Sequence, residues 1–193
     1  MKFSTKPYRK KHQGFSLVEL MFAMVVLTVA ILGGMLMVSM GMLRNNTNKL
    51  DTTATNVAQT VLEDIAGTDP TTANTLTVTD CLLNNLSINT AGSTATAGAG
   101  AQLKSDGSGD IDFTESAATP AANNYQMNYT VCGSNGLQTV YDVRWNIRDV
   151  GPAAPTGNTY GKMVTVSARQ VFVNTSKGIA FIEPVTLRTI VGM

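Results

Sequence analysis

Residues 14–19 read Gly-Phe-Ser-Leu-Val-Glu, and the 24 residues after them, from Leu20 to Leu43, carry no charge. A helix that rises ~1.5 Å per residue would cover about 36 Å over this run, more than the roughly 30 Å of a bilayer's hydrocarbon core. The next charged residue is Arg44. The stretch therefore predicts a membrane-spanning helix near the N-terminus.

The segment before this helix is basic. Residues 1–14 hold five of the 14 lysines and arginines and no acid, which leaves nine basic and 13 acidic residues in the rest of the chain. Basic residues on one flank orient a membrane helix with that flank in the cytoplasm. The apolar run is too long for a cleavable secretory signal and too apolar on all sides for a buried helix of a soluble protein.

A simple membrane anchor would fit this length and orientation, but it does not account for Glu19. Placing an ionised side chain at mid-bilayer costs about 2.5–3.5 kcal/mol, and less near the membrane edge. Such residues are usually functional. Glycines also interrupt the apolar run, at Gly33, Gly34 and Gly41. They fit either close packing of membrane helices or a point where the helix can stretch.

Together, the basic leader, Gly14-Phe15 and Glu19 resemble the cleavage and methylation motif of type IV prepilins and pseudopilins. The resemblance covers about residues 1–45. It implies that a prepilin peptidase cuts after Gly14 and methylates the new amine of Phe15. It also implies that Glu19, the fifth residue of the mature chain, pairs with the amine of an adjacent subunit during assembly.

The same resemblance implies the partners and the location. The expected partners are other pilin subunits, the prepilin peptidase and an assembly platform in the inner membrane. The protein is expected in the inner membrane as a single-pass protein with a periplasmic C-terminus, and then in a pilus on the cell surface. Such filaments, or fimbriae, serve cell adhesion or motility.

Helical periodicity continues beyond the membrane run. Apolar residues recur at spacings of three and four, which is one face of a helix. Gly67 and Pro70 are good stop signals. We expect one long helix over residues 15–66, with residues 15–43 in the membrane or filament core and residues 44–66 amphipathic. The stripe is made of Leu50, Ala54, Val57, Val61 and Ile65.

Residues 67–193 are expected to form an extracytoplasmic globular region. Residues 87–120 are rich in small polar residues and predict a variable surface loop. About four strands are expected over residues 125–191. In the strand at residues 139–148, Asp142, Arg144, Asn146 and Arg148 are expected to face water. The expected fold is α+β: a long helix whose second half packs on an antiparallel sheet, as in type IV pilins.

The two cysteines, Cys81 and Cys132, allow only one pairing. A disulfide is expected if this part of the chain leaves the cytosol. The chain has one histidine, His12, and it lies in the leader. Removal of the leader would leave no histidine for a metal site or a catalytic triad.

Residues 104–115 resemble a twelve-residue calcium loop, but Lys104 stands at the first ligand position. A turn that leads into a strand is the favoured interpretation, and calcium binding is the alternative. The candidate ligands are Asp106, Ser108, Asp110, Asp112 and Glu115.

No phosphate-binding loop, metal cluster or nucleophile–base pair is visible, so we expect neither an enzyme nor a cofactor. The basic residues do not form a nucleic-acid surface. Residues 27–34 and Val143-Arg144-Trp145 are similar to PilV-type minor pilins, and a minor pilin is the expected role. The alternatives are a major pilin, a pseudopilin of a type II secretion system, and an anchored binding protein that never polymerises.

Overall fold

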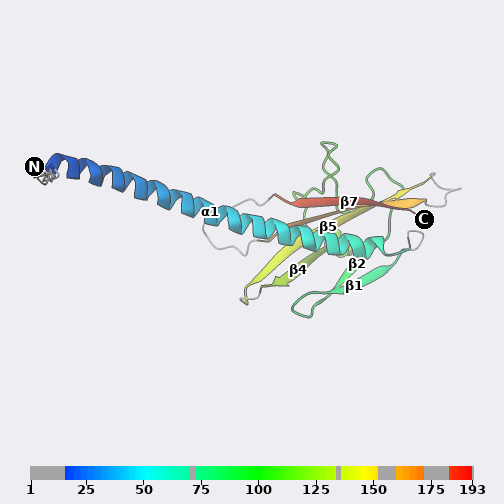
Figure 1. Ribbon diagram of the computed structural model, residues 1–193. Coiled ribbons are helices and arrows are strands. Elements are labelled where there is room, and N and C mark those ends of the chain that lie inside the picture. The colour runs from blue at the N-terminus through cyan, green and yellow to red at the C-terminus, as the bar shows by residue number, and fades with distance from the viewer. Residues whose placement is uncertain (1–15, 70–72, 134–135, 152–159, 172–182, 193) are drawn as a thin grey trace, which may run out of the picture. The chain divides into compact units, whose positions relative to one another are not determined.

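The computed structural model describes residues 16–69, 73–133, 136–151, 160–171 and 183–192 (Figure 1). Helix α1 runs over Leu17–Ala66. It ends where the sequence places its stop signal, since the Gly67 N–H donates to the Glu63 carbonyl at 2.8 Å. The chain divides into two compact units, residues 1–46 and residues 47–193.

In the second unit, a hairpin follows α1. Strands β1 (Thr75–Thr79) and β2 (Asn85–Asn89) pair antiparallel as a separate two-stranded sheet. The turn between them covers residues 80–84. The sequence predicts strands only over residues 125–191, so this hairpin is a difference from expectation. Alternate residues of both strands are partly or fully buried, but five residues give too short a pattern to identify a strand from sequence alone.

The main sheet is antiparallel and has five strands. Its central strand β5 (Gln138–Val150) pairs with β6 (Gly161–Gln170) on one edge. On the other edge it pairs with β4 (Gln126–Cys132) and with the two-residue strand β3 (Ala99–Gly100). Strand β7 (Val185–Gly192) pairs with β6. The expected α+β architecture is confirmed, with β4 to β7 as the four expected strands and β3 as a fifth.

The hydrophobic core joins the amphipathic part of α1 to this sheet. The helix contributes five buried residues at helical spacing, and the sheet contributes inward-facing residues of β4, β5 and β6. This is the packing that the periodic stripe predicts. The buried core residues are Ala54, Val57, Ala58, Val61 and Ile65 from α1, Ile88 from β2, and Tyr125, Met127, Tyr141, Val143, Trp145, Ile147, Val164, Val166 and Ala168 from the main sheet and its entry.

Trp145 lies at the centre of this core and is fully buried. Its indole N–H donates to the Asn89 carbonyl at 2.9 Å, and its ring lies 6.4 Å from that of Tyr125. The Tyr125 hydroxyl donates to the Ala91 carbonyl at 2.8 Å. Both aromatic side chains therefore satisfy their polar groups while filling the core.

The opposite face of β5 is not wet, contrary to expectation. Asp142, Arg144 and Asn146 are only 4%, 1% and 3% exposed. The Asn146 amide donates to the Ala97 and Ala101 carbonyls at 2.9 and 2.8 Å. The segment at residues 91–117 lies over this face and supplies the partners that water would otherwise provide. Strand alternation predicts only which side chains share a face, so the covering segment was missed.

Charges bind this covering segment to the sheet. Arg144 donates to both oxygens of Asp142 at 3.2 and 3.0 Å, and to the Glu115 carbonyl at 3.0 Å. Arg169 also pairs with Asp142 at 3.3 Å. The Phe113 ring lies under both guanidinium groups, at 4.9 and 4.4 Å from its centroid. Cation–π contact and buried ion pairing thus act together at one point of the segment.

The segment at residues 87–120 is therefore more than a surface loop. It contains the end of β2, strand β3 and the fully buried side chains of Ala101 and Ile111. The short helix α2 (Ala118–Ala122) begins at its end. The composition of this segment does not predict such a role, because side chains of β5 bind it through its backbone carbonyl groups, which every residue type has.

The buried ion pair leads to a stability prediction. Arg144→Met should lower the free energy of unfolding by about 3 kcal/mol, because the buried Asp142 carboxylate loses the guanidinium that pairs with both of its oxygens and keeps only the longer contact with Arg169 and the Gln126 amide. The measurement is urea unfolding of the detergent-solubilised full chain, followed by Trp145 fluorescence. Arg148→Met, on the same strand but only half-buried, is the matched control and should cost less than about 1 kcal/mol. Equal losses in the two variants would contradict the prediction.

Candidate functional site

Glu19 lies in the first turn of α1. The turn is closed by the Leu20 N–H, which donates to the Ser16 carbonyl at 3.2 Å. The first N–H groups of a helix have no partner within it, and the helix dipole favours a carboxylate there. The sequence-predicted cleavage residues, Gly14 and Phe15, lie outside the described residues.

No partner for Glu19 is found among the described residues. The ion pairs found there join Lys104 to Asp110, and Asp142 to Arg144 and Arg169. The Glu19 side chain is exposed. A carboxylate that must enter apolar surroundings needs a cation and hydrogen bonds, because an unpaired buried charge is strongly unfavourable. The geometry is therefore that of a group open to pairing with a cation from elsewhere.

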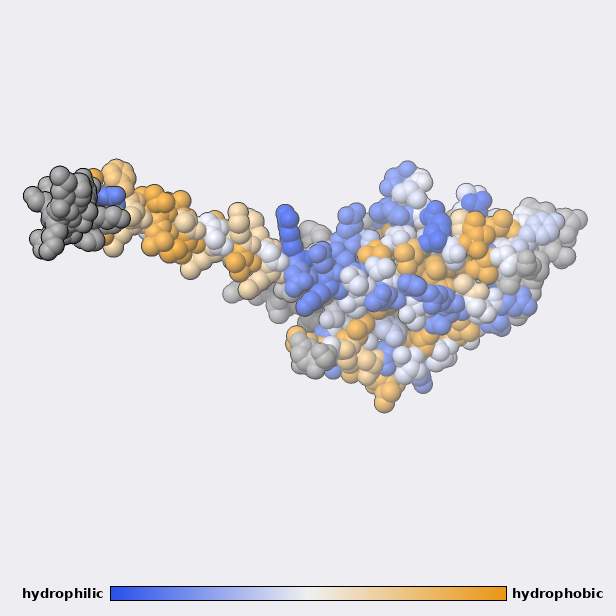
Figure 2. Space-filling view, in the orientation of Figure 1, coloured by the Kyte–Doolittle hydropathy of each residue, from blue (hydrophilic) through white to orange (hydrophobic). Residues whose placement is uncertain are grey.

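The apolar part of α1 exposes its side chains on every side. From Leu17 to Leu43, the large apolar residues are between 50% and 79% exposed. Figure 2 shows this surface as a nearly continuous hydrophobic stretch. Burying one such side chain stabilises a protein by about 1.5–3 kcal/mol. α1 is the one helix in the described residues that is long and apolar enough to cross a membrane.

Polar side chains within this run are satisfied by the helix itself. The Thr28 hydroxyl donates to the Met24 carbonyl at 2.7 Å, and the Ser39 hydroxyl donates to the Met35 carbonyl at 2.9 Å. Such bonds let hydroxyl groups enter hydrocarbon without an unpaired donor. Glu19 is therefore the one polar side chain of Leu17–Leu43 for which the helix provides no hydrogen-bond partner.

The glycines of this run pack against nothing in the part of the chain that the structure describes. A Cβ atom added at Gly33, Gly34 or Gly41 would meet nothing within 4 Å. Their small size therefore matters only for contacts with lipid or with other helices, or for the flexibility of the helix.

A second candidate region lies at the turn between β1 and β2. Cys81 in this turn forms a disulfide with Cys132 at the end of β4, with the Cα atoms 5.9 Å apart. The Cys81 N–H also donates to the Thr130 carbonyl at 3.4 Å. The disulfide that the sequence predicts is thus present. It closes a loop with a sequence separation of 51 residues, which constrains the unfolded chain by about 4 kcal/mol.

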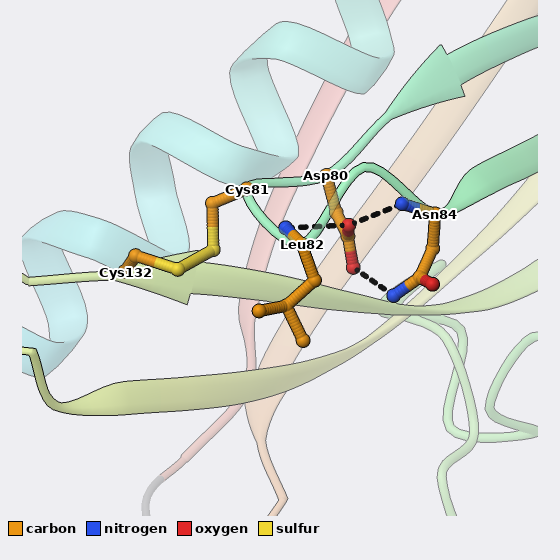
Figure 3. The surroundings of a disulfide bond; sticks show 5 residues. All are labelled: Asp80, Cys81, Leu82, Asn84 and Cys132. Atoms are coloured by element: carbon orange, nitrogen blue, oxygen red, sulfur yellow. Dashed lines mark hydrogen bonds between the residues drawn. A yellow bond between two sulfur atoms is a disulfide. The ribbon is translucent and has the colours of Figure 1, made fainter.

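Asp80 fixes the shape of the same turn (Figure 3). One carboxylate oxygen accepts the N–H groups of Leu82 and Asn84, both at 2.9 Å, and the other accepts the Asn84 side-chain amide at 3.0 Å. Burial acts to raise the pKa of this carboxyl. Hydrogen bonds from Asn84, Leu82 and Thr130 together outweigh burial and hold the pKa below its ordinary value.

The turn presents two leucines to solvent. Leu82 is 44% exposed and Leu83 is 82% exposed. Leu83 has a φ of 66°, the left-handed conformation that glycine and asparagine tolerate better than a bulky residue. Sequence reasoning missed this feature. Its signals were Asp80 and the Asn84-Asn85 pair around two leucines, since Asp and Asn favour turns.

The calcium-loop alternative has no support in the geometry of residues 104–115. The Asp106 and Asp112 carboxylates accept the N–H groups of Ser108 and Thr114, which are ordinary turn contacts. The Asp110 carboxylate pairs with Lys104 at 3.5 Å, and Glu115 accepts the Gln102 N–H at 3.0 Å. The candidate ligands do not converge. In the described part of the chain, no group of three or more His, Cys, Asp or Glu side chains is placed to hold a metal ion.

Comparison with known proteins concerns the N-terminal region around Glu19. Residues 9–35 match a family model described as the prokaryotic N-terminal methylation motif. The matched span contains Gly14, Phe15 and Glu19. No curated protein matches the chain, and no solved structure matches it. A motif of this kind is typical of type IV prepilin-like subunits.

Asp80 gives a pH prediction. A folded-state pKa below the ordinary carboxyl value of about 3.9 means that the ionised form stabilises the folded protein above that value. This contribution is lost as the pH falls through the lower folded-state pKa. Asp80→Asn should therefore unfold more easily than wild type at neutral pH, and the difference should shrink below about pH 4.

The measurement is the urea midpoint of both proteins between pH 7 and pH 2.5, again followed by Trp145 fluorescence. A difference that stays constant over this range would contradict the assignment.

Proposed function

We propose that this chain, whose residues 9–35 form a prepilin-type methylation motif, is a minor pilin of a type IV pilus. The prepilin peptidase cuts it after Gly14 and methylates the amine of Phe15. The mature subunit then enters the filament through α1. The observation that carries the proposal is Glu19, a carboxylate in the first turn of α1, at the start of a run up to Leu43 whose large exposed side chains are otherwise apolar.

The charge of Glu19 supports a filament rather than a plain anchor. A membrane anchor gains nothing from a carboxylate near the start of its apolar helix. In a filament, helices from several subunits pack together, and the amine of a neighbouring Phe15 offers the missing cation. Such a pair forms only at one axial offset between two helices, so it would set the register of assembly.

Cleavage would change the chain in two further ways. Residues 1–14 carry five basic residues, so the mature chain would have nine basic and 13 acidic residues and be acidic. The only histidine, His12, would be removed. We assign residues 1–14 as the leader, residues 15–43 as the membrane and filament-core segment, and residues 44–66 as the amphipathic part of the helix.

The rest of the chain fits a periplasmic and then extracellular location. The disulfide between Cys81 and Cys132 would persist in an oxidising compartment and not in the cytosol. An N-terminal anchor with a basic leader would place residues 67–193 on that side of the inner membrane. The partners of this subunit would be other pilins, the peptidase and the assembly platform.

The minor-pilin assignment rests on residues 27–34 and on Val143-Arg144-Trp145. In the structure, Val143 and Trp145 are core residues of β5, and Arg144 holds the covering segment. These three residues therefore stabilise the folded unit, and they do not form a ligand site. The major pilin and the pseudopilin remain the competing assignments, because both use the same helix.

Glu19→Ala tests the assembly role. The variant should be cleaved and methylated normally, because the peptidase acts at Gly14 and Phe15, but its level in filaments should fall at least tenfold. Intact-mass spectrometry detects processing as the mass of a chain that begins at methylated Phe15. Immunoblotting of sheared filaments measures how much of the subunit is incorporated.

Glu63→Ala, on the exposed face of the same helix, is the matched control and should be incorporated normally. Normal incorporation of Glu19→Ala would exclude the pairing. A chain that keeps its leader in cells with an active prepilin peptidase would exclude the pilin assignment as a whole.

Copy number tests the subtype. In sheared native filaments, quantitative mass spectrometry should find this subunit at a few per cent or less of the most abundant pilin. A share near one half or above would identify a major pilin. Its presence in a secretion complex and absence from surface filaments would identify a pseudopilin.

A further inference from the structure

Two turns of the second unit lie beside each other and expose leucines. The disulfide joins the β1–β2 turn to the end of β4, directly before the turn in which the Gly136 N–H donates to the Gly133 carbonyl and which leads through Leu137 into β5. Leu137 in that turn is 67% exposed, alongside Leu82 and the 82% exposed Leu83. We call these three residues the leucine tip. Figure 2 shows apolar surface on the edge of this unit where the β1–β2 turn lies.

The leucine tip is held in place at a cost to stability. The Asp80 carboxylate and the disulfide fix the β1–β2 turn, and Leu83 adopts a left-handed backbone conformation. Exposed leucines in a strained and rigid turn do nothing for the fold, because Asn or Gly would suit the backbone better. A rigid, exposed apolar group is typical of a docking surface.

The chain around the tip is uncharged. No Asp, Glu, Lys or Arg occurs between Cys81 and Leu103 or between Tyr125 and Tyr141. Asp80 is buried, and both of its carboxylate oxygens accept hydrogen bonds. These two stretches therefore carry no charged side chain that would have to lose its hydration shell on entering an apolar or interfacial environment.

The length of the chain limits how far the tip can lie from the membrane segment. The Tyr141 hydroxyl donates to the Leu50 carbonyl at 3.4 Å, so the start of β5 contacts α1 at Leu50. Leu137 is four residues before Tyr141, about 13 Å along a strand. Leu50 is seven residues beyond Leu43, the end of the apolar run, which is about 10 Å in a helix and at most roughly 25 Å extended.

We propose that the leucine tip docks on the bilayer that α1 spans before assembly, with its leucines in the interfacial region of the periplasmic leaflet. The proposal rests on the membrane anchoring that the proposed function assigns to α1. A short tether raises the effective concentration of the surface at the tip, so a few exposed leucines suffice where a free domain would not bind. Docking holds the folded unit against the membrane until the subunit is extracted.

The test uses tryptophan as a depth reporter in the full chain. Leu83→Trp and Ile190→Trp proteins are reconstituted into phosphatidylethanolamine and phosphatidylglycerol vesicles whose acyl chains are brominated near the headgroup. Bromine quenches tryptophan on contact. The native Trp145 is fully buried and gives the same background in every protein.

Ile190 is a matched control because it is 69% exposed but lies elsewhere on the sheet. It pairs with Met163, which lies opposite Arg148 in β5. Arg148 is ten residues from Gln138 at the other end of that strand, about 33 Å away. Leu83→Trp should lose at least half of its added emission to the brominated lipid, and Ile190→Trp should lose almost none.

Leu137→Trp provides a second reporter if Leu83→Trp does not fold. It should also be quenched, and the quenching should disappear when Leu82 and Leu83 are both changed to Asn, which suits the backbone at Leu83. Vesicle flotation is measured on every sample. Protein that does not float has no inserted α1, and that result overturns the anchoring and with it the proposal.

Protein that floats without quenching at the tip overturns the docking proposal and leaves the proposed function standing. Quenching that is equal at Leu83→Trp and Ile190→Trp also overturns it. A tip emission that shifts to the blue only at high protein-to-lipid ratio, without quenching, identifies contact with a second copy instead and overturns it as well.

Discussion

The change of solvent along one helix is the constraint on which this structure depends. α1 is apolar on all sides up to Leu43. Beyond that it keeps only one apolar stripe, which packs on the main sheet through Ala54, Val57, Val61 and their neighbours. The first part needs hydrocarbon or other helices, and the second part needs a sheet. The single carboxylate of the first part, Glu19, is the group that neither lipid nor the rest of the described chain satisfies, and the proposed function gives it a partner in a neighbouring subunit.

Much of this could be predicted because it is local and periodic. The helix end at Ala66 follows from Gly67, and the core face of β5 follows from strict alternation through Val143, Trp145 and Ile147. The α+β architecture follows from these two periods. The methylation motif could be identified because cleavage and pairing require particular residues at fixed spacing.

The parts that could not be predicted depend on contacts between distant segments. Arg144 is buried because Glu115 and Phe113 lie over it, and nothing near position 144 shows this. The β1–β2 hairpin was missed because its strands are short, and the exposure of Leu83 follows from a turn whose geometry Asp80 sets. Several of the deciding partners are backbone groups, such as the Glu115 carbonyl and the Leu82 N–H, and a sequence pattern does not show which backbone groups a side chain will contact.

The disulfide has a mechanical consequence for a subunit held by its helix. Tension in a filament would enter the folded unit through α1 and leave Ala66 along the chain toward β1. Only the 14 residues from Gly67 to Asp80 separate the helix from Cys81. Beyond them the load would pass through the covalent bond to Cys132, at the end of β4 and next to the central strand. Extension would stop when these residues reach their full length of about 50 Å, with the covering segment at residues 91–117 still inside the loop that the disulfide closes.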